Sequence, residues 1–274
     1  MIFNKTISIG VILSAIWLVG IVTLSVFAPL LPINDPEELD LFSMLATPNG
    51  DHFMGTDSLG RDIFSRVIYG GQISLFVGLG SVMIGLLFGS TLGVIAAFYQ
   101  GRIDTMIMGV MNVMLSFPAL ILAVAIIGFL GASIIVVISA IGVVFIPAFA
   151  RIARANTLVY RSKEFVLVAR TLGATDLRIL SREILPNLIG PLFSYSLVMF
   201  AVAILAESSL GFLGLSVPPP APSWGGMISA ERTNLETAVH TILMPGLVMF
   251  ITVVALNILG EKAQRHFDVR KTVL

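Results

Sequence analysis

The sequence predicts an all-α membrane protein with six transmembrane helices, and three observations lead to that prediction. Of its 274 residues, 57% are hydrophobic and only 12% are charged, whereas charged residues make up about 25% of an ordinary soluble domain. Six apolar runs are long enough to cross about 30 Å of hydrocarbon. The basic residues gather in alternate connections between these runs. Part of the protein surface is therefore expected to contact lipid rather than water.

The six predicted spans follow in chain order at residues 7–31, 73–98, 105–129, 132–150, 188–210 and 241–259. The first is too long for a secretory signal and ends in Pro29-Leu30-Leu31-Pro32 rather than at small residues, so we interpret it as a retained anchor. In the second, Gly85, Gly89 and Gly93 recur every four residues, which predicts close packing against another helix. Pro118 in the third predicts a kink.

The basic residues fix the orientation. With the N-terminus inside, the outer segments hold only Arg61, Arg66 and Arg232. The cytoplasmic segments hold the other thirteen of the sixteen, namely Lys5, Arg102, Arg151, Arg154, Arg161, Lys163, Arg170, Arg178, Arg182, Lys262, Arg265, Arg270 and Lys271. Both termini are therefore expected in the cytoplasm.

The sequence shows none of the common catalytic or metal-binding motifs. The chain has no cysteine and a net charge of zero, so neither thiolate chemistry nor bulk attraction to nucleic acid is expected. Its three histidines are scattered, without metal-ligand spacing. No phosphate-binding glycine loop or nucleophile elbow occurs. We expect no catalytic residue, no bound metal and no cofactor.

The spans also lack the ionisable groups that an ion-driven transporter needs near mid-membrane. Glu207 is the exception, but it follows Pro186 by about twenty residues and so lies near the outer surface at 1.5 Å per residue. It is either an interfacial carboxylate or a residue at the outer mouth of a pathway. An energy source outside the chain is expected.

The longest cytoplasmic segment, residues 151–187, holds seven cations whose burial in lipid would cost roughly 20 kcal/mol. An apolar stripe recurs at helical spacing and comprises Phe165, Val168, Ala169 and Leu172. Gly173 is expected to end this helix. Thr175 or Asp176 is expected to cap a second one, with its stripe at Leu177, Leu180 and Ile184. Pro186 marks the end of that helix or the first turn of the next span.

Three interpretations fit two short amphipathic helices joined at a glycine. A DNA-reading helix-turn-helix is disfavoured between two membrane spans. A pair of helices lying on the membrane surface also fits the pattern. The favoured interpretation is a projection that a cytoplasmic partner receives in a groove.

At this point the residues match a family pattern. Glu164, Ala169, Gly173 and Leu185-Pro186 resemble the "EAA…G…LP" signature of permease subunits of bacterial ABC importers. Phe165-Val166 and Glu183 depart from the general signature and are similar to the peptide-permease branch. Further stretches resemble the second, C-type permease of dipeptide, oligopeptide and nickel importers, namely "GTDSLGRDIFSR", "SFPALILA", "ESSLGFLGL", "PPAPSWGGMI" and "NILGEKAQRHFDVR".

The first of these stretches predicts a folded patch in the outer loop. Gly55 and Gly60 permit turns, and Thr56, Asp57 and Asp62 can cap helices or pair with Arg61 and Arg66. Residues 63–68 predict a short helix lying on the outer surface. A structural role and a role in docking or gating both stay open. Farther along, residues 218–222 and Trp224 predict a rigid outer turn with an interfacial anchor.

The resemblance implies a type I ABC importer transmembrane fold, with an N-terminal helix and outer loop at residues 1–72 and a five-helix core at 73–274. It implies a homologous second permease in a heterodimer, two ATP-binding subunits, an extracytoplasmic binding protein and the bacterial inner membrane. ATP and Mg would act in the ATP-binding subunits, and this chain would hydrolyse nothing. Residues 169–176 would form the coupling helix, with Arg170 and Asp176 fixing its register and Ala174 and Thr175 in its turn.

Among the solutes that the resemblance implies, di- or oligopeptides are the first choice. The same role for nickel, a metallophore or glutathione is the alternative. An ion-driven secondary transporter and a membrane scaffold are the interpretations from other classes, and the scarcity of mid-membrane ionisable groups disfavours the first of them.

Overall fold

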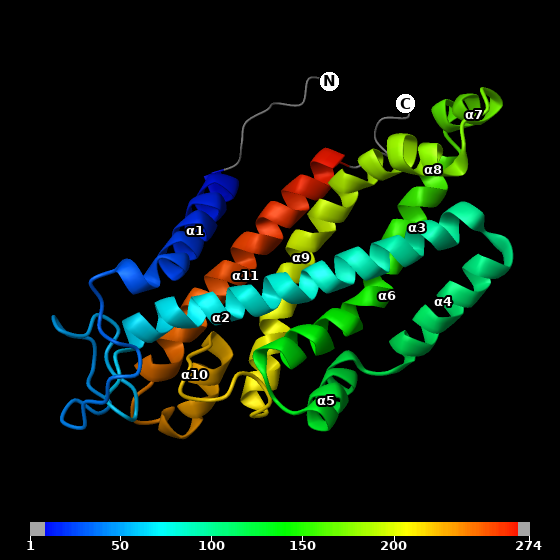
Figure 1. The fold of residues 1–274 in the computed structure, drawn as a ribbon. Coiled ribbons are helices and arrows are strands. Elements are labelled where there is room, and N and C mark those ends of the chain that lie inside the picture. The colour runs from blue at the N-terminus through cyan, green and yellow to red at the C-terminus, as the bar shows by residue number, and fades with distance from the viewer. Residues whose placement is uncertain (1–8, 268–274) are drawn as a thin grey trace.

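A computed structural model describes residues 9–267 of the chain as helices joined by short connections and one long outer loop (Figure 1). The α-helices are α1 (Ile9–Val26), α2 (Ile63–Ile84), α3 (Ser90–Tyr99), α4 (Gly101–Ser116), α5 (Ala119–Leu130), α6 (Ile134–Arg161), α7 (Glu164–Thr171), α8 (Asp176–Arg178), α9 (Leu185–Phe212), α10 (Trp224–Ala230) and α11 (His240–Phe267). Two π-helical turns, η2 (Gly85–Gly89) and η3 (Ile179–Ile184), join α2 to α3 and α8 to α9. Two 3₁₀ turns are η1 (Ala28–Leu30) and η4 (Arg232–Asn234).

Five of the six predicted spans are confirmed as single long helices. They are α1, the continuous helix Ile63–Tyr99, α6, the continuous helix Asp176–Phe212, and α11. The two composite helices have 37 residues each and are therefore about 55 Å long. Because hydrocarbon spans only about 30 Å, their ends project beyond the bilayer or the helices tilt.

The third predicted span, residues 105–129, is not one straight helix. It is divided into α4 and α5, which meet at an angle of 87°. Phe117, between them, is extended at φ −86° and ψ 134°. Pro118 explains the break, because its ring disfavours a helical conformation at the preceding residue and it has no N–H to donate. The predicted kink at Pro118 is confirmed, and it is large enough to split the span.

The predicted surface helix at residues 63–68 is wrong. These residues are the first turns of α2, which runs on into the membrane without a break. Asp62 caps the helix, and its side chain accepts a hydrogen bond from the Ser65 N–H at 2.8 Å. Ile63, Val67 and Ile68 are buried by their own chain rather than lying on lipid. Their apolar face packs into the protein. An apolar face alone therefore does not distinguish a helix on the membrane surface from the start of a membrane span.

The predicted glycine stripe is confirmed as a close helix contact. A Cβ atom at Gly93 would overlap the carbonyl oxygen of Ala150 on α6, and one at Gly89 would overlap that of Ile146. At Gly85 the obstacle is the side chain of Phe145. Only glycine lets the backbones of the α2–α3 helix and α6 approach this closely.

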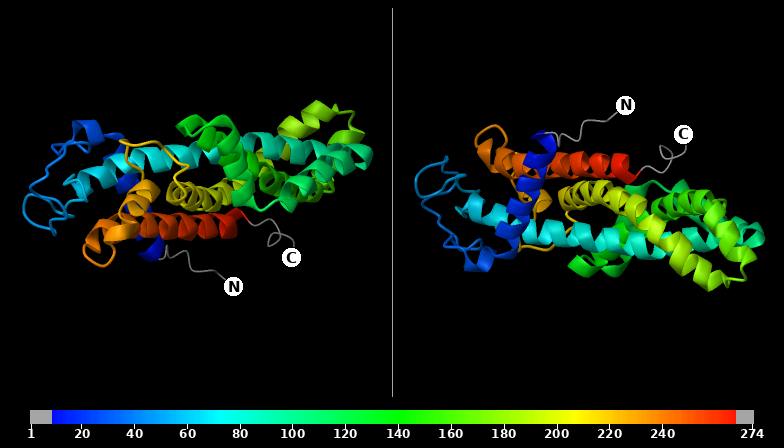
Figure 2. Two further views of the ribbon diagram at one scale, coloured as in Figure 1. Left: turned by 90° about the horizontal axis from the view of Figure 1, so that it is seen from below. Right: turned by 90° about the horizontal axis from the view of Figure 1, so that it is seen from above.

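The two ends of the molecule differ in character (Figures 1 and 2). One end holds helix α10 and the long loop between η1 and α2. The opposite end holds α7 and the turn between α3 and α4. This arrangement agrees with the orientation predicted from the basic residues, with α7 on the cytoplasmic side. Lys5, Arg270 and Lys271, which contributed to that prediction, lie outside the described residues.

Candidate functional site

The cytoplasmic end carries a projection formed by α7, the following turn and α8, which we call the cytoplasmic knob (residues 164–178; Figure 1). The predicted arrangement of a helix, a glycine turn and a second helix start is confirmed. Glu164 is the first residue of α7, in its first turn. Within residues 9–267, no hydrogen bond or ion pair engages the Glu164 carboxylate.

Gly173 ends α7 in a Schellman motif. Its φ of +79° lies in the left-handed region, where a residue with a Cβ is disfavoured. The Gly173 N–H donates to the Arg170 carbonyl and the Ala174 N–H donates to the Ala169 carbonyl, both at 3.0 Å. Nothing lies within 4 Å of a Cβ added at Gly173. Backbone conformation, not lack of space, therefore requires glycine at this position.

Thr175, rather than Asp176, caps the second helix. Its hydroxyl oxygen accepts a hydrogen bond from the Arg178 N–H at 3.4 Å. Asp176 is the first helical residue, where its negative charge suits the helix N-terminus.

The sequence predicted a short second helix in this loop, and that prediction is wrong. The second helix continues through the π turn η3 into α9, forming one helix from Asp176 to Phe212. Pro186 is at the first turn of α9 and cannot donate to the carbonyl four residues earlier. The wider π turn directly before it accommodates the proline without ending the helix. Leu185 and Pro186 therefore lie at the junction between knob and span.

One buried side chain of the knob and two of the π turn that follows it pack into the core of the protein. Val166 in α7 and Ile179 and Ile184 in η3 are almost completely buried. The Arg170 guanidinium carbon lies 6.0 Å from the ring centre of Phe98 at the end of α3. Sequence reasoning missed Val166, Ile179 and Phe98, because the apolar run around Val166 gives no periodic signal for which side chain faces inward.

The larger of the remaining apolar side chains of the knob are exposed. Leu172 is 81% exposed and Leu177 is 76% exposed. Phe165 and Val168 of the predicted stripe are also exposed, while Ala169 is half-buried. In the second predicted stripe Leu180 and Ile184 turn inward, so Leu177 belongs to the exposed face instead. An apolar patch on an aqueous surface indicates an interaction site.

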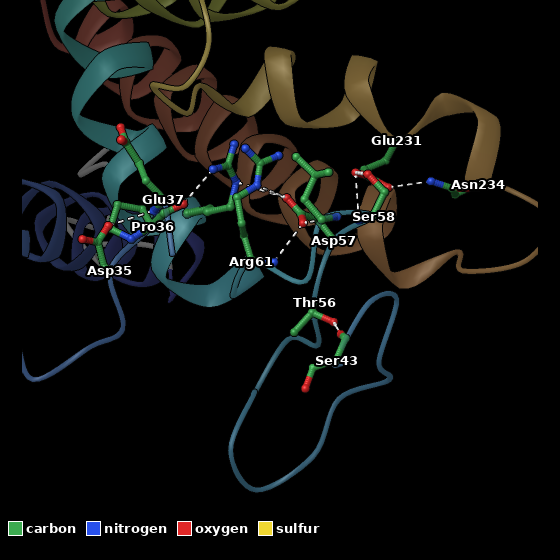
Figure 3. Close-up of polar contacts among 12 residues, drawn as sticks. Asp35, Pro36, Glu37, Ser43, Thr56, Asp57, Ser58, Arg61, Glu231 and Asn234 are labelled. Carbon is green, nitrogen blue, oxygen red and sulfur yellow. Dashed lines mark hydrogen bonds and ion pairs between the residues drawn. The ribbon is translucent and has the colours of Figure 1, made fainter. Parts of the chain in front are cut away.

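At the outer end, Asp57 organises the predicted folded patch (Figure 3). One carboxylate oxygen accepts from the backbone N–H groups of Leu59 and Arg61, both at 2.9 Å, and the other from the Arg61 guanidinium at 2.7 Å. Arg66 lies 3.6 Å from the same carboxylate and donates to the Pro36 carbonyl at 2.7 Å. Asp57 and Arg66 are both buried, so the charges compensate one another away from water.

The glycines and caps of this patch act as predicted. Gly55 and Gly60 have φ values of +78° and +77°. Thr56 pairs with Asp62 in an isolated β-bridge, and its hydroxyl donates to the Ser43 carbonyl. Asp62 caps α2 and also contacts the His52 ring nitrogen at 3.0 Å.

Glu231 connects this patch to the segment after α10. Its carboxylate accepts from the Ser58 hydroxyl at 2.7 Å and from the Asn234 side chain at 2.8 Å (Figure 3). Its side chain is buried. This role of Glu231 could not be predicted from the sequence, because Ser58 and Glu231 are 173 positions apart.

Glu207 and Trp224 lie at the outer end, as predicted, but both are 0% exposed. Glu207 accepts hydrogen bonds from the hydroxyls of Ser74 in α2 and Ser216. Trp224 donates its ring N–H to the Val67 carbonyl at 2.9 Å. Glu207 is therefore neither an exposed interfacial carboxylate nor a lining residue of an open mouth in this structure. The prediction of Trp224 as an interfacial anchor is wrong, because it packs inside the protein between α2 and α9.

Comparisons with known proteins agree with this geometry. The family model described as "Binding-protein-dependent transport system inner membrane component" matches residues 89–273. A glutathione transport system permease protein of Pectobacterium atrosepticum is 38% identical, over 87% of this chain and 79% of that protein. A dipeptide transport system permease protein of Alkalihalophilus pseudofirmus is 37% identical, over 97% and 86%. A putative peptide transport system permease protein of Brucella suis is 38% identical, over 98% and 90%.

The fold has a counterpart among solved structures. An inward-facing structure of the MetNI methionine ABC transporter superposes with a TM-score of 0.63 at 18% identity, over 74% of this chain and 96% of the other. The family model matches most of the chain, and the several helices long enough to span a membrane agree with that match. The protein therefore belongs to the family of inner-membrane components of binding-protein-dependent transport systems.

Proposed function

We propose that this chain is one of two transmembrane subunits of an ATP-driven importer, and that its cytoplasmic knob receives force from an ATP-binding subunit. The observation that carries the proposal is the exposed apolar face of the knob. This face is at the cytoplasmic end and is formed by the exposed side chains of Phe165, Val168, Leu172 and Leu177. A groove on a cytoplasmic partner supplies the missing cover.

The knob is connected so that its movement reaches the spans. Its second helix is continuous with α9 from Asp176 to Phe212. Its first helix contacts the end of α3 through Arg170 and Phe98. A displacement of the knob therefore moves two spans together, as a coupling element requires.

The proposed partners follow from this role. A homologous second permease completes the pathway in a heterodimer, two ATP-binding subunits use ATP and Mg, and an extracytoplasmic binding protein delivers the solute. The chain itself has a mechanical role and no catalytic one. The names of its relatives, which refer to binding-protein-dependent, peptide and glutathione transport, support this assembly.

We propose short peptides as the solute class. Two of the relatives described above are named for dipeptides or peptides, and one for glutathione, which is itself a tripeptide. Glutathione import is the second candidate on that observation. Nickel or a metallophore is the third, and it rests on the sequence resemblance alone.

The test is uptake by the complete complex in proteoliposomes, with ATP turnover measured alongside. Gly173→Pro removes the N–H that caps α7 and cannot adopt a φ of +79°. Glu164→Lys reverses the charge at the first residue of α7. Both variants are expected to insert in the membrane normally and to lose uptake and binding-protein-stimulated ATP turnover together.

Gly214→Pro is the matched control for Gly173→Pro, because the Gly214 N–H also donates to the carbonyl three residues earlier. Gly214 also has a positive φ, +74°, and open space around it, but it lies in the connection between α9 and α10 at the outer end. It carries similar backbone strain without touching the knob. Normal uptake in Gly173→Pro and Glu164→Lys would exclude the knob as the coupling element.

A further inference from the structure

A groove with apolar walls lies between α1 and α2, near the outer ends of both spans. Its volume is about 490 Å³, and its walls include Val22 and Val26 of α1 and Phe76 of α2. All three side chains are exposed. Helix α1 is fixed in place beside the groove, because the Trp17 ring N–H donates to the Thr252 hydroxyl of α11 at 3.0 Å. The groove is therefore a built feature of the fold.

A second space, of about 570 Å³, adjoins the groove, and we call it the outer cavity. Gln72 and Ile73 line both the groove and the outer cavity. Ile73 is the first residue of the second predicted span and so marks the outer limit of the hydrocarbon. From this level the groove follows α2 into the membrane, whereas the outer cavity extends to Asp35 and Glu37 in the outer loop. Together the two spaces cross from hydrocarbon to the headgroup region.

The outer cavity carries negative charge that the chain does not neutralise. The charged residues of its lining are Asp35 and Glu37, and both are exposed. The Asp35 carboxylate accepts from the Glu37 backbone N–H at 2.9 Å (Figure 3). Within residues 9–267, neither carboxylate forms an ion pair, because Arg66, which donates to the intervening Pro36 carbonyl, lies beside Asp57 instead. A cationic group is the complement of this surface.

Ser25 of α1 is an independent indication of a ligand, at the level where the groove and the outer cavity meet. It lines the groove and is 1% exposed. A Cβ added at Gly71, the residue before Gln72, would overlap the Ser25 hydroxyl. Within the described part of the chain this hydroxyl has no hydrogen-bond partner. Because a buried hydroxyl without a partner is unfavourable, an acceptor on a bound molecule would stabilise it.

The other polar side chains of the outer cavity are neutral. Asn34, Tyr69 and Gln72 provide amide and hydroxyl donors, and tyrosine is enriched where hydrocarbon meets headgroups. From the membrane outward, the site therefore presents apolar walls, a buried hydroxyl, neutral donors and two carboxylates. A phospholipid with an ammonium headgroup presents the matching groups in the same order, namely an acyl chain, an ester carbonyl, a phosphate and a cation.

We propose that the groove and the outer cavity bind one outer-leaflet phospholipid with an ammonium headgroup, such as phosphatidylethanolamine. An acyl chain lies in the groove, and an ester carbonyl accepts from Ser25. Tyr69 and Gln72 donate to the phosphate, and the ammonium group lies between Asp35 and Glu37. A lipid of net negative charge lacks the cation and is disfavoured by the two carboxylates. The bound lipid fills the space between α1 and α2 and joins the outer loop to both helices.

The test is lipid binding to the delipidated complex in detergent, measured by native mass spectrometry. Phosphatidylethanolamine is compared with phosphatidylglycerol of the same acyl chains. The wild-type protein is expected to bind one phosphatidylethanolamine roughly fivefold more tightly than phosphatidylglycerol, from two ammonium–carboxylate contacts. The double variant Asp35→Asn with Glu37→Gln keeps the shape of both side chains and removes their charge. It is expected to bind the two lipids alike.

Glu38→Gln with Asp51→Asn is the matched control, because both residues are exposed in the same loop and line neither space. This variant should keep the preference, and an equal loss of preference in it would overturn the inference. Equal affinities for the two lipids in the wild-type protein would also overturn it. So would a crosslink from Val26→Cys to the second permease, since a subunit would then fill the groove. No transported solute enters the measurement, so its outcome is separate from that of the proposed function.

Discussion

At the scale of single residues, the buried carboxylate of Glu207 shows how polar groups fix the outer end of the molecule. Ser74 and Ser216 donate to it from two other segments, and Ser74 in turn accepts from the Trp224 backbone N–H at 3.2 Å. One side chain therefore joins α2, α9 and the start of α10. A buried acceptor of this kind is strongly destabilising to remove, because its donors are left without partners.

Glu207→Ala is expected to lower the stability of the complex by about 1–3 kcal/mol. Thermal unfolding in detergent measures this change. Glu236→Ala is the control, since Glu236 is exposed at the same end and its removal should leave the unfolding temperature unchanged. Equal unfolding temperatures for the two variants would show that the hydrogen bonds of Glu207 do not hold the outer end together.

Residue burial is where prediction from the sequence was weakest. The position of Glu207 near the outer surface followed from counting residues along a helix. Its burial depended on Ser74, which is 133 positions away. Val166 is a similar case, since five apolar residues in a row, at positions 165–169, give no indication of which one packs inward. In contrast, Gly173 and Thr175 were predictable, because a helix end and a helix cap depend on local backbone chemistry.

At the scale of elements, the contact between the α2–α3 helix and α6 depends on glycine. The Cα of Gly93 lies so close to α6 that an added Cβ would overlap the Ala150 carbonyl. Both partners at this point are backbone, which cannot move aside as a flexible side chain can.

Gly93→Ala is therefore expected to destabilise the protein by about 1–3 kcal/mol through overpacking. Gly20→Ala is the matched control, because Gly20 is in the middle of α1 with nothing within 4 Å of an added Cβ. That change should be neutral or slightly stabilising, since alanine favours helix more than glycine does. Unfolding of both variants by urea tests the comparison, and equal loss at the two positions would contradict tight packing at Gly93.

Elements were predictable to the extent that hydropathy determines them. Five spans follow directly from apolar length, and the glycine stripe predicted a close contact. The 87° break between α4 and α5 is local, and hydropathy averaged over a span does not register the extended backbone at Phe117. Of the two places expected for Pro186, the first turn of the next span is confirmed. The continuity of α8 into α9 was not predicted, because a proline usually marks a helix boundary and the π turn before it keeps the helix continuous here.

At the scale of the whole molecule, two ends with different chemistry are joined by long helices in a multi-pass inner-membrane protein. The outer end is closed by buried ion pairs and hydrogen bonds around Asp57 and Glu231. The cytoplasmic end leaves an apolar face uncovered at the knob. The helix Asp176–Phe212 runs without a break from the knob to the outer end, and the proposed function uses it as the path along which force reaches the spans.

The central claim is that the knob lies in a groove of an ATP-binding subunit. Because the natural chain has no cysteine, a single Leu172→Cys change places one thiol at the most exposed apolar residue of the knob. Phe53→Cys, in the exposed outer loop, is the control. The measurement is thiol-to-amine crosslinking in the purified complex, followed by mass identification of the joined subunits.

The predicted result is a crosslink from position 172 to an ATP-binding subunit, weakened when the Gly173 turn is disrupted by proline, and none from position 53 to that subunit. A thiol at position 172 that reacts freely with a small maleimide in the assembled complex, yet joins no ATP-binding subunit, would contradict the claim.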